Sequence, residues 1–174
     1  LRQADTITRD IQGRDHLHTR HHDVMLEAAA TSLQIHLQLP PARSVRYYNS
    51  AMILSAPLLA VSANSPYLFG HDLWDETRIP LFEQAVAVSP RAESRANRVT
   101  FGHAYVRQSL MQCFEENLTD YAVLLPTPLQ TPPESLAHLR LHNGTLWRWN
   151  RPLIGFDDAG APHLRLEHRV MPAG

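Results

Sequence analysis

The amino-acid sequence predicts an α+β protein with an antiparallel sheet, and three observations support that class. Residues 31–39 alternate strictly between polar and apolar side chains, as a half-buried strand does. Residues 145–150 and 163–170 alternate in the same way, and the turn-forming residues 157–160 between them favour a hairpin. The segments between these strands include helical patterns, so helices are expected to pack on one face of the sheet.

Residues 1–22 are polar and predict only weak helicity. The next element, the strand over 31–39, is expected to end at two prolines and to bury Leu33, Ile35, Leu37 and Leu39. Residues 42–63 predict a helix whose second half is apolar on every side, which indicates a buried helix. We expect Pro57 to kink this helix and residues 64–66 to end it.

Two more helices are predicted over residues 73–88 and 103–118. Residues 121–125 form a short apolar run that is typical of a strand, and the prolines within 126–133 indicate a loop. A short helix is expected over residues 133–142. The final strand should point Leu164, Leu166 and Val170 into a core and His163, Arg165, Glu167 and Arg169 away from it.

The composition places the 174 residues in a single globular domain. A content of 44% apolar residues can supply a core, and the formal net charge of -1 argues against a nucleic-acid partner. No apolar run reaches the length of a membrane span, and the lone Cys113 cannot form an internal disulfide; both fit a cytoplasmic protein. Because the chain begins without Met and ends just after a strand pattern, we interpret residues 1–174 as a fragment of a longer protein.

The strongest local signal for chemistry is the strand face formed by Arg165, Glu167 and Arg169. Residues at i and i+2 lie roughly 7 Å apart on one side of a strand. Two arginines that flank one carboxylate can hold a polyphosphate together with a divalent cation. The chain has no Lys, which excludes a Walker-type lysine and Schiff-base chemistry and leaves Arg to bind any phosphate. The alternative is a solvated strand face with cross-strand ion pairs.

A second polar face carries Gln34 and His36, with Glu27 a short stretch earlier. A neutral imidazole can ligate a metal, and Gln can ligate it or bind substrate. A single histidine in this position is more often a hydrogen-bonded surface residue than a metal ligand. Two polar strand faces in one sheet favour a shared site.

Four segments together resemble the glutamate–cysteine ligase family, in the order and spacing of that family. They span nearly the whole chain: residues 25–39 (MLEAAATSLQIHLQL), 58–66 (LLAVSANSP), 143–151 (NGTLWRWNR) and 164–174 (LRLEHRVMPAG). The resemblance implies part of a glutamine-synthetase-like domain, in which a curved antiparallel sheet holds ATP, Mg²⁺ or Mn²⁺, and glutamate. It also implies that the family's N-terminal strand, which supplies further metal carboxylates, lies outside these residues, so the site should be incomplete here.

By this resemblance, Glu167 is a metal ligand, Arg165 contacts a nucleotide phosphate, and Arg169 contacts phosphate or the acyl intermediate. Gln34 and His36 lie where the family places side chains that face metal or phosphate, and Glu27 is predicted as a further metal ligand. Many members carry two histidines on this strand, so Gln34 is a departure that leaves the individual roles open.

Three more residues are weaker candidates. Arg148 is predicted to contact phosphate and Arg78 to contact substrate or phosphate. Asn64 either binds substrate or caps the preceding helix.

The predicted function is an ATP-dependent carboxylate–amine ligase that works through an acyl phosphate, with glutamate and an amine such as cysteine as substrates. The sequence leaves open a same-fold ligase for another amine, a non-catalytic binding or assembly domain, and a homo-oligomer. A further alternative is a metal-dependent hydrolase that uses the histidines of residues 16–22, but only the number of histidines there supports it. Cys113, Trp147 and Trp149 are interpreted as packing residues rather than as a nucleophile or a base-stacking pair.

Overall fold

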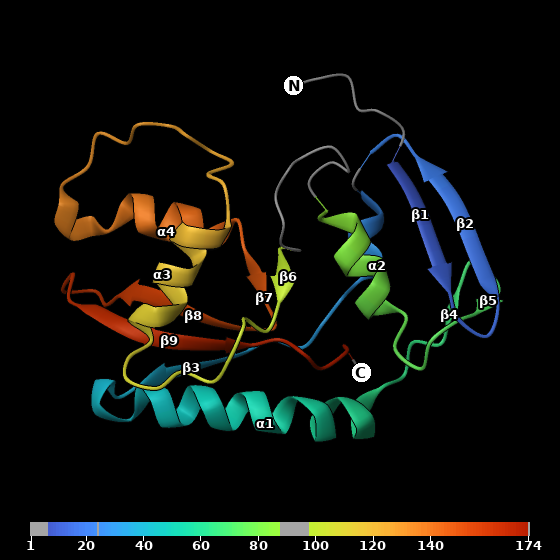
Figure 1. Ribbon diagram of the computed structural model, residues 1–174, viewed down its shortest axis with the longest axis horizontal. Helices are drawn as coiled ribbons and strands as arrows, with labels where there is room; N and C mark the ends of the chain where they lie inside the picture. Colours follow the sequence, from blue (N-terminus) through green and yellow to red (C-terminus); the bar gives the residue numbers. More distant parts are fainter. Residues whose placement is uncertain (1–6, 24, 88–97, 174) are drawn as a thin grey trace.

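The computed structural model describes residues 7–23, 25–87 and 98–173. It has mixed helix and sheet with antiparallel pairing at its centre, which confirms the predicted α+β class (Figure 1). The strands are β1 Ile7–Gln12, β2 His16–His21, β3 Ile35–Leu39, β4 Tyr67–Leu68, β5 His71–Asp72, β6 Val99–Thr100, β7 Trp147–Arg148, β8 Asn150–Phe156 and β9 Pro162–His168. The α-helices are α1 Ser44–Ser62, α2 Arg78–Ala85, α3 Met111–Asp120 and α4 Ala137–Gly144. Short 3-10 helices cover Met25–Ala29, Pro41–Arg43 and Pro133–Ser135.

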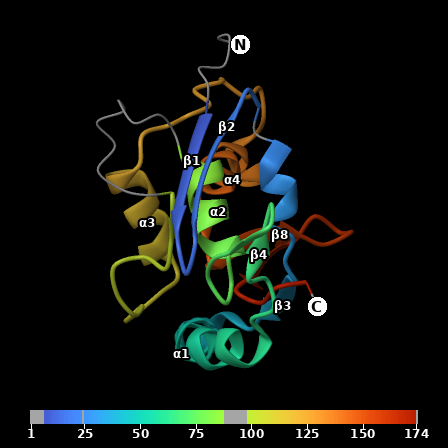
Figure 2. The ribbon, with the colours of Figure 1, turned by 90° about the vertical axis from the view of Figure 1, so that its right-hand side faces the viewer.

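The central sheet has three antiparallel strands in the order β3-β9-β8. The β8–β9 hairpin turns at residues 157–161, where Asp157 Oδ1 accepts hydrogen bonds from two backbone N–H groups, so the predicted turn is confirmed. Helix α1 runs beneath this sheet (Figures 1 and 2). Tyr48 of α1 packs with Leu39 and Leu166 in one buried cluster, which fixes the face of the sheet that α1 covers.

The prediction of weak helicity near the N-terminus is wrong for the described residues, because β1 and β2 form an antiparallel hairpin. Residues 1–6 of that prediction lie outside the described chain. The hairpin buries Ile11 and Leu17 against Leu73 and Leu81. Arg9 fills another inward position of β1 and is also buried, with Nη2 donating to the Ala85 carbonyl oxygen. Because a charged residue occupies this buried position, the sequence of β1 lacks the polar–apolar alternation that would have predicted a strand.

Helix α1 forms where it was predicted, but the expectation that it is buried is wrong. It continues through Pro57, and one side of it faces solvent, with Ile53 61% and Val61 84% exposed. The prediction for the strand at 31–39 is also only partly right, because Leu39 is buried whereas Leu33, Ile35 and Leu37 are exposed. β3 is an edge strand of the described sheet, and a hollow of about 570 Å³ remains between it and α1.

Helices α2 and α3 are shorter than the sequence predicted, and the strand predicted over residues 145–150 is replaced by β7 and the start of β8. α2 begins at Arg78 because the ribbon of β4 and β5 ends at Asp72, and residues 73–77 form a turn that contains an isolated bridge between Glu76 and Ser65. Val88 lies outside the described residues. α3 begins at Met111, and residues 121–125 are a loop rather than the predicted strand. Within the described chain, none of the helices has the length and apolar character that a membrane span requires.

A polar network joins α1 to the central sheet inside the core. Asn150 Nδ2 donates to Ser55 Oγ at 3.0 Å, and Asn150 Oδ1 faces His168 Nδ1. Since the Asn150 oxygen can only accept, His168 Nδ1 carries the proton. Burial lowers the pKa of His168 from its usual 6.5, so the imidazole is neutral in the folded protein.

We predict that this burial makes the protein less stable as the pH falls below about 6.5. A base whose pKa is lower in the folded state binds fewer protons there than in the unfolded chain, so unfolding takes up a proton in that range. Urea unfolding at pH 7 and pH 5 should therefore show a smaller loss of stability for His168→Gln than for the parent. His22→Gln alters an exposed imidazole and should keep the parental difference. If the stability of all three proteins depended equally on pH, the lowered pKa of His168 would not be the cause.

Candidate active site

The candidate site lies on the sheet face opposite α1. His36 of β3, Glu167 of β9 and Arg151 of β8 pair in register, so their side chains form one row across three strands. Arg151 Nε donates to Glu167 Oε2 at 2.6 Å, and His36 Nε2 lies 3.7 Å from Glu167 Oε1. The Glu167 side chain is 3% exposed and that of His36 is 41% exposed. The row therefore runs from a buried carboxylate to an imidazole that solvent can reach.

Arg165 lies one step along β9 on the same face and packs over Gly155 of β8. A Cβ at Gly155 would lie 2.8 Å from Arg165 Nη2 and 2.6 Å from His163 Nε2, so a side chain there would displace both groups. Arg165 Nε is buried and has no hydrogen-bond partner within the described residues. A half-buried guanidinium with unused donor capacity is suited to an anionic ligand.

Arg169 follows the end of β9 and is buried, with its guanidinium 5.0 Å from the centre of the Phe82 ring. Burial lowers the pKa of Arg169, and the nearby carboxylates of Glu167 and Glu27 oppose that shift. The guanidinium groups of Arg151 and Arg78 lower it further. Arg169 therefore lies among two carboxylates and two other guanidinium groups, where burial disfavours its charge and a bound anion would stabilise it.

Arg78 and Asn64 meet at the buried carboxylate of Glu76. Arg78 Nε donates to Glu76 Oε1 at 3.0 Å, and the Asn64 backbone N–H donates to Glu76 Oε2 at 3.4 Å. Arg78 also donates to the Val170 carbonyl oxygen, next to Arg169, and burial lowers its pKa. Asn64 and Glu76 line a hollow of about 1080 Å³ beside the end of α1. The C-cap of α1 is Ala63, so Asn64 is one residue beyond the cap position.

Arg148, in contrast, belongs to a separate cluster around α3. Its Nη2 atom lies 2.8 Å from Glu116 Oε1, and its Nε donates to Asn117 Oδ1 at 3.1 Å. Burial lowers the pKa of Arg148, but the charges of Tyr48, Glu116 and Cys113 outweigh it and the net shift is upward. The structure therefore does not bring Arg148 to the row on β9.

Glu27 and Gln34 lie at the margin of the row. Glu27 is an exposed residue of the 3-10 helix at Met25–Ala29, close enough to Arg169 to affect its pKa. Gln34 is exposed directly before β3, where the neighbouring Leu33 N–H donates to the Met171 carbonyl oxygen at 3.1 Å.

Two residues of the site were missed in the sequence, Arg151 and Glu76. Arg151 could have been found, because strand pairing counted back from the turn at 157–160 places it opposite Glu167. Glu76 carries no such signal, since its contacts with Arg78 and Asn64 depend on how the ribbon at β4–β5 folds.

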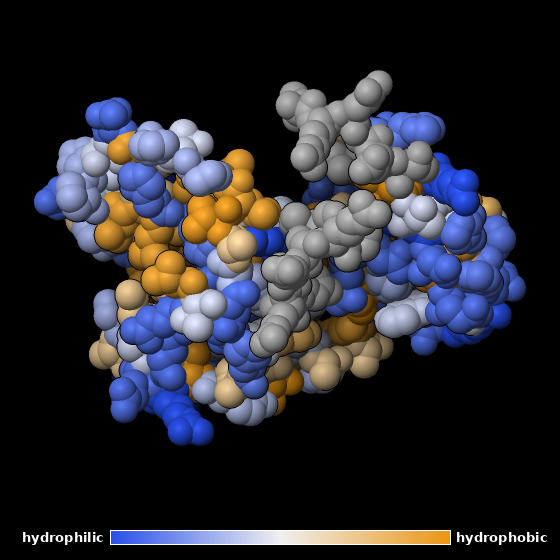
Figure 3. Space-filling model, turned by 45° about the horizontal axis from the view of Figure 1, so that its top comes forward, coloured by the Kyte–Doolittle hydropathy of each residue, from blue (hydrophilic) through white to orange (hydrophobic). Residues whose placement is uncertain are grey.

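Other conspicuous residues have roles in packing or on the surface. Cys113 and Trp149 are buried in hydrophobic clusters, which confirms their interpretation as packing residues, and burial raises the pKa of the Cys113 thiol. His16 and His18 lie on the exposed side of β2 beside Asp10. Apolar side chains gather over α3 and α4 (Figure 3), where a hollow of about 600 Å³ contains none of the predicted site residues.

The fold and the arginine-rich sheet face define an α+β protein suited to an anionic ligand. Residues 7–110, more than half of the chain, match the sequence model of glutamate-cysteine ligase family 2, and the chain belongs to that family. Membership implies a ligase and confirms the resemblance seen in the sequence. The match includes Glu27, Gln34, His36, Asn64 and Arg78 and ends before β7, β8 and β9. No curated protein and no solved structure matches the chain.

We predict that Arg151→Gln destabilises the protein by on the order of 3 kcal/mol, because it leaves the Glu167 carboxylate buried without its cation. The double variant Arg151→Gln/Glu167→Gln should recover much of that loss, since it removes the buried charge as well. Urea unfolding of the two single variants and the double variant measures the coupling. Arg14→Gln breaks exposed ion pairs with Asp72 and Asp75 and should change stability little. An Arg151 variant as stable as the Arg14 variant would show that the pair is not structural.

Proposed function

We propose that the chain carries part of the active site of an ATP-dependent ligase, which joins the carboxylate of glutamate to an amine, with cysteine as the first candidate. Family membership supports the ligase class. The arrangement around Glu167 supports the use of a phosphorylated intermediate, because it concentrates arginines on one sheet face. We place this reaction in the cytoplasm, because the lone Cys113 fits a reducing compartment, and the domain in the glutamine-synthetase-like class, on the resemblance of the four sequence segments.

The charge balance of the site is the observation that carries the proposal. Four guanidinium groups lie near three carboxylates, namely Arg78, Arg151, Arg165 and Arg169 against Glu27, Glu76 and Glu167. Two of the arginines, Arg78 and Arg169, are buried, where a low dielectric strengthens their attraction for an anion. Arginine's planar fork also matches the geometry of phosphate oxygens.

The donors near Glu167 fit a divalent cation that shares its coordination with phosphate. Glu167 Oε2 is engaged by Arg151, whereas Oε1 faces His36 at 3.7 Å. One carboxylate oxygen and one imidazole, completed by phosphate oxygens and water, suit Mn²⁺ better than Mg²⁺, because Mg²⁺ prefers oxygen ligands. Glu167 and His36 would hold the ion, with Gln34 and Glu27 nearby. Bound there, the ion would neutralise charge on the transferred phosphoryl group.

The proposed reaction requires the protein to align the reactants and to neutralise the charge of the transferred phosphoryl group. A carboxylate is a poor electrophile, so its oxygen first attacks the γ-phosphorus of ATP, giving an acyl phosphate and ADP. The amine then attacks the acyl carbon, and phosphate leaves as the amine loses a proton. Arg165 would orient the nucleotide phosphates, and Arg169 would hold the phosphoryl group of the acyl phosphate. No covalent bond to the enzyme is required.

We expect the full-length protein that contains this chain to release ADP from ATP and a divalent cation only when glutamate and cysteine are both present. A coupled assay that compares glutamate alone, cysteine alone and the pair makes the test. Release with glutamate that is indifferent to cysteine would keep the acyl-phosphate chemistry and redirect the search to other amines. If no amino acid supports release, the ligase proposal fails for this chain and a binding or assembly role replaces it.

We predict that Glu167→Gln lowers metal-dependent ATP turnover by on the order of a hundredfold, because it removes a charged ligand that the proposed cation needs. Initial rates over a range of Mn²⁺ concentrations measure the loss, and urea unfolding checks that the variant is folded. Glu134→Gln makes the same chemical change at an exposed position and should leave turnover unaltered. Near-parental turnover in a folded Glu167→Gln protein would remove Glu167 from the site.

A further inference from the structure

His103, Glu116 and Asp120 form a group of potential metal ligands away from the sheet. Each offers one ligand atom, and these atoms all lie within 4.8 Å of one another. His103 Nε2 lies 2.7 Å from Asp120 Oδ2 and 3.9 Å from Glu116 Oε1. Among the residues that the structure describes, no other three histidines, cysteines or carboxylates come together in this way.

The local sequence brings these ligands together. Glu116 and Asp120 are four residues apart on α3, so they lie on one face of the helix. His103 follows Gly102, whose φ of +87° favours glycine and whose N–H donates to Thr100 Oγ1 at 3.0 Å. A Cβ at Gly102 would collide with the Arg148 guanidinium and approach Glu116. Glycine therefore lets the loop pass close to α3 and present the imidazole to the two carboxylates.

Arg148 orients one of the ligands and limits the affinity of the group. Its Nη2 atom lies 2.8 Å from Glu116 Oε1, and its side chain is 1% exposed, so the pair is fixed in the core. One guanidinium against two carboxylates leaves a single negative charge beside the neutral form of the imidazole. The His103 side chain is 69% exposed, so water can complete the coordination. These features describe a site of moderate affinity that is open to solvent.

We propose that His103, Glu116 and Asp120 bind a divalent transition-metal ion, with Zn²⁺ as the leading candidate. An imidazole nitrogen with two carboxylates suits Zn²⁺, whereas Mg²⁺ and Ca²⁺ prefer oxygen ligands alone. Because the ligands come from the loop at residues 101–106 and from α3, the ion ties that loop to the helix. The ion would stabilise the folded protein and would take no part in the site on the sheet face that holds Glu167.

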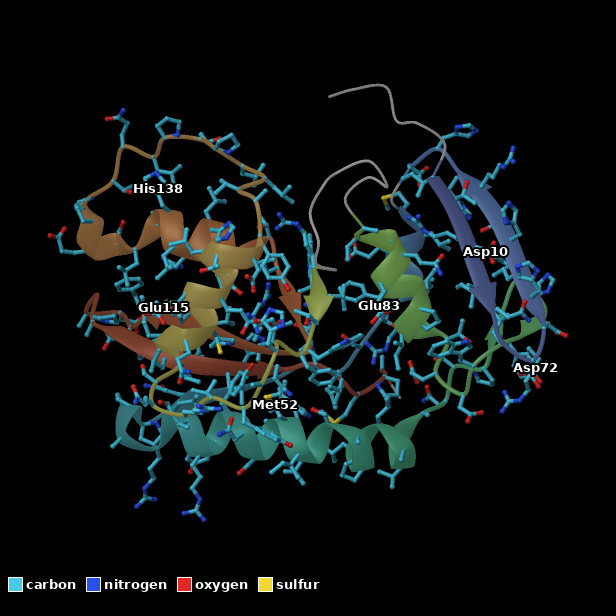
Figure 4. All side chains as sticks on the ribbon, in the orientation of Figure 1. Asp10, Met52, Asp72, Glu83, Glu115 and His138 are labelled. Atoms are coloured by element: carbon cyan, nitrogen blue, oxygen red, sulfur yellow. The ribbon has the colours of Figure 1, made fainter. Side chains whose placement is uncertain are left out.

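The chain contains two matched comparisons for this proposal (Figure 4). Glu115 neighbours Glu116 on α3 but is exposed and outside the group. Asp10 lies on the β1–β2 hairpin and contacts His16 at 2.7 Å, the same distance as the His103–Asp120 contact. Asp10 and His16 nevertheless belong to no three-ligand group in the described chain. Glu115→Gln therefore tests general charge on α3, and Asp10→Asn tests whether an aspartate beside two histidines, His16 and His18, is enough.

Zn²⁺ titration by isothermal calorimetry, in the presence of excess Mg²⁺, tests the proposal on the parent and four variants. We expect Asp120→Asn and His103→Gln to lose at least about tenfold in affinity at one site, while Glu115→Gln and Asp10→Asn keep it. Zn²⁺ should also raise the unfolding temperature of the parent but not of Asp120→Asn. Equal affinity in all five proteins, or a loss confined to Asp10→Asn, would overturn the assignment.

A second measurement covers the case in which a variant does not fold. In the parent protein, Zn²⁺ should shift the ¹⁵N resonance of His103 Nε2 at lower concentration than those of the hairpin histidines. A shift at His16 or His18 that precedes the shift at His103 would place the ion on the hairpin and refute the site on α3.

Discussion

The buried ion pair between Glu167 and Arg151 is the constraint on which the central sheet depends. Glu167 lies on the middle strand with its side chain 3% exposed, so its carboxylate would be costly to bury without a cation. Arg151 supplies that cation only if the β8–β9 hairpin keeps the register that places the two residues opposite each other. The turn at 157–161 and the ion pair therefore specify the same pairing.

That register also separates the two faces of β9. Leu166 points toward α1 and joins Leu39 and Tyr48, while His168 on the same side completes the network with Asn150 and Ser55. Arg165 and Glu167 point the other way. A slip of one residue would exchange these sets, burying charges against α1 and exposing the core leucine. The alternation of side chains along β9 therefore determines both the buried core on one face and the arginine-rich face on the other.

Local pattern was enough to predict β3, β9, helix α1 and the polar row that contains His36 and Glu167. It placed the first strand of the hairpin at residues 145–150, whereas β8 is Asn150–Phe156. It failed where the outcome depends on distant segments. Arg9 occupies an inward position of β1 because Ala85 of α2 offers it a carbonyl oxygen, and nothing near Arg9 in the sequence indicates this. Helix α1 was predicted to be buried because its second half is apolar on every side. Such a sequence does not show which side of the helix packs against the sheet. Arg148, which the sequence analysis predicts to contact phosphate, is held by Asn117 and Glu116 instead, away from the row on β9.

The family assignment and the site geometry cover different parts of the chain. The family match ends at residue 110, whereas Arg151, Arg165, Glu167 and Arg169 lie beyond it. The two parts are joined physically by pairing of β3 with β9 and by Arg78, which bonds to Glu76 and to the Val170 carbonyl oxygen. Through these contacts the matched part positions the residues that the ligase reaction would use.

Paramagnetic broadening by Mn²⁺–ATP is the most direct test of the central claim, which is that nucleotide binds on the sheet face around Glu167. With free Mn²⁺ kept negligible, backbone amides of β3, β8 and β9 near His36, Arg151 and Glu167 should broaden first. Amides on the outer side of α1 should remain sharp. Broadening confined to α1 or to the loop and helix at residues 101–120 would contradict the account, because the nucleotide would then bind away from the arginine-rich face.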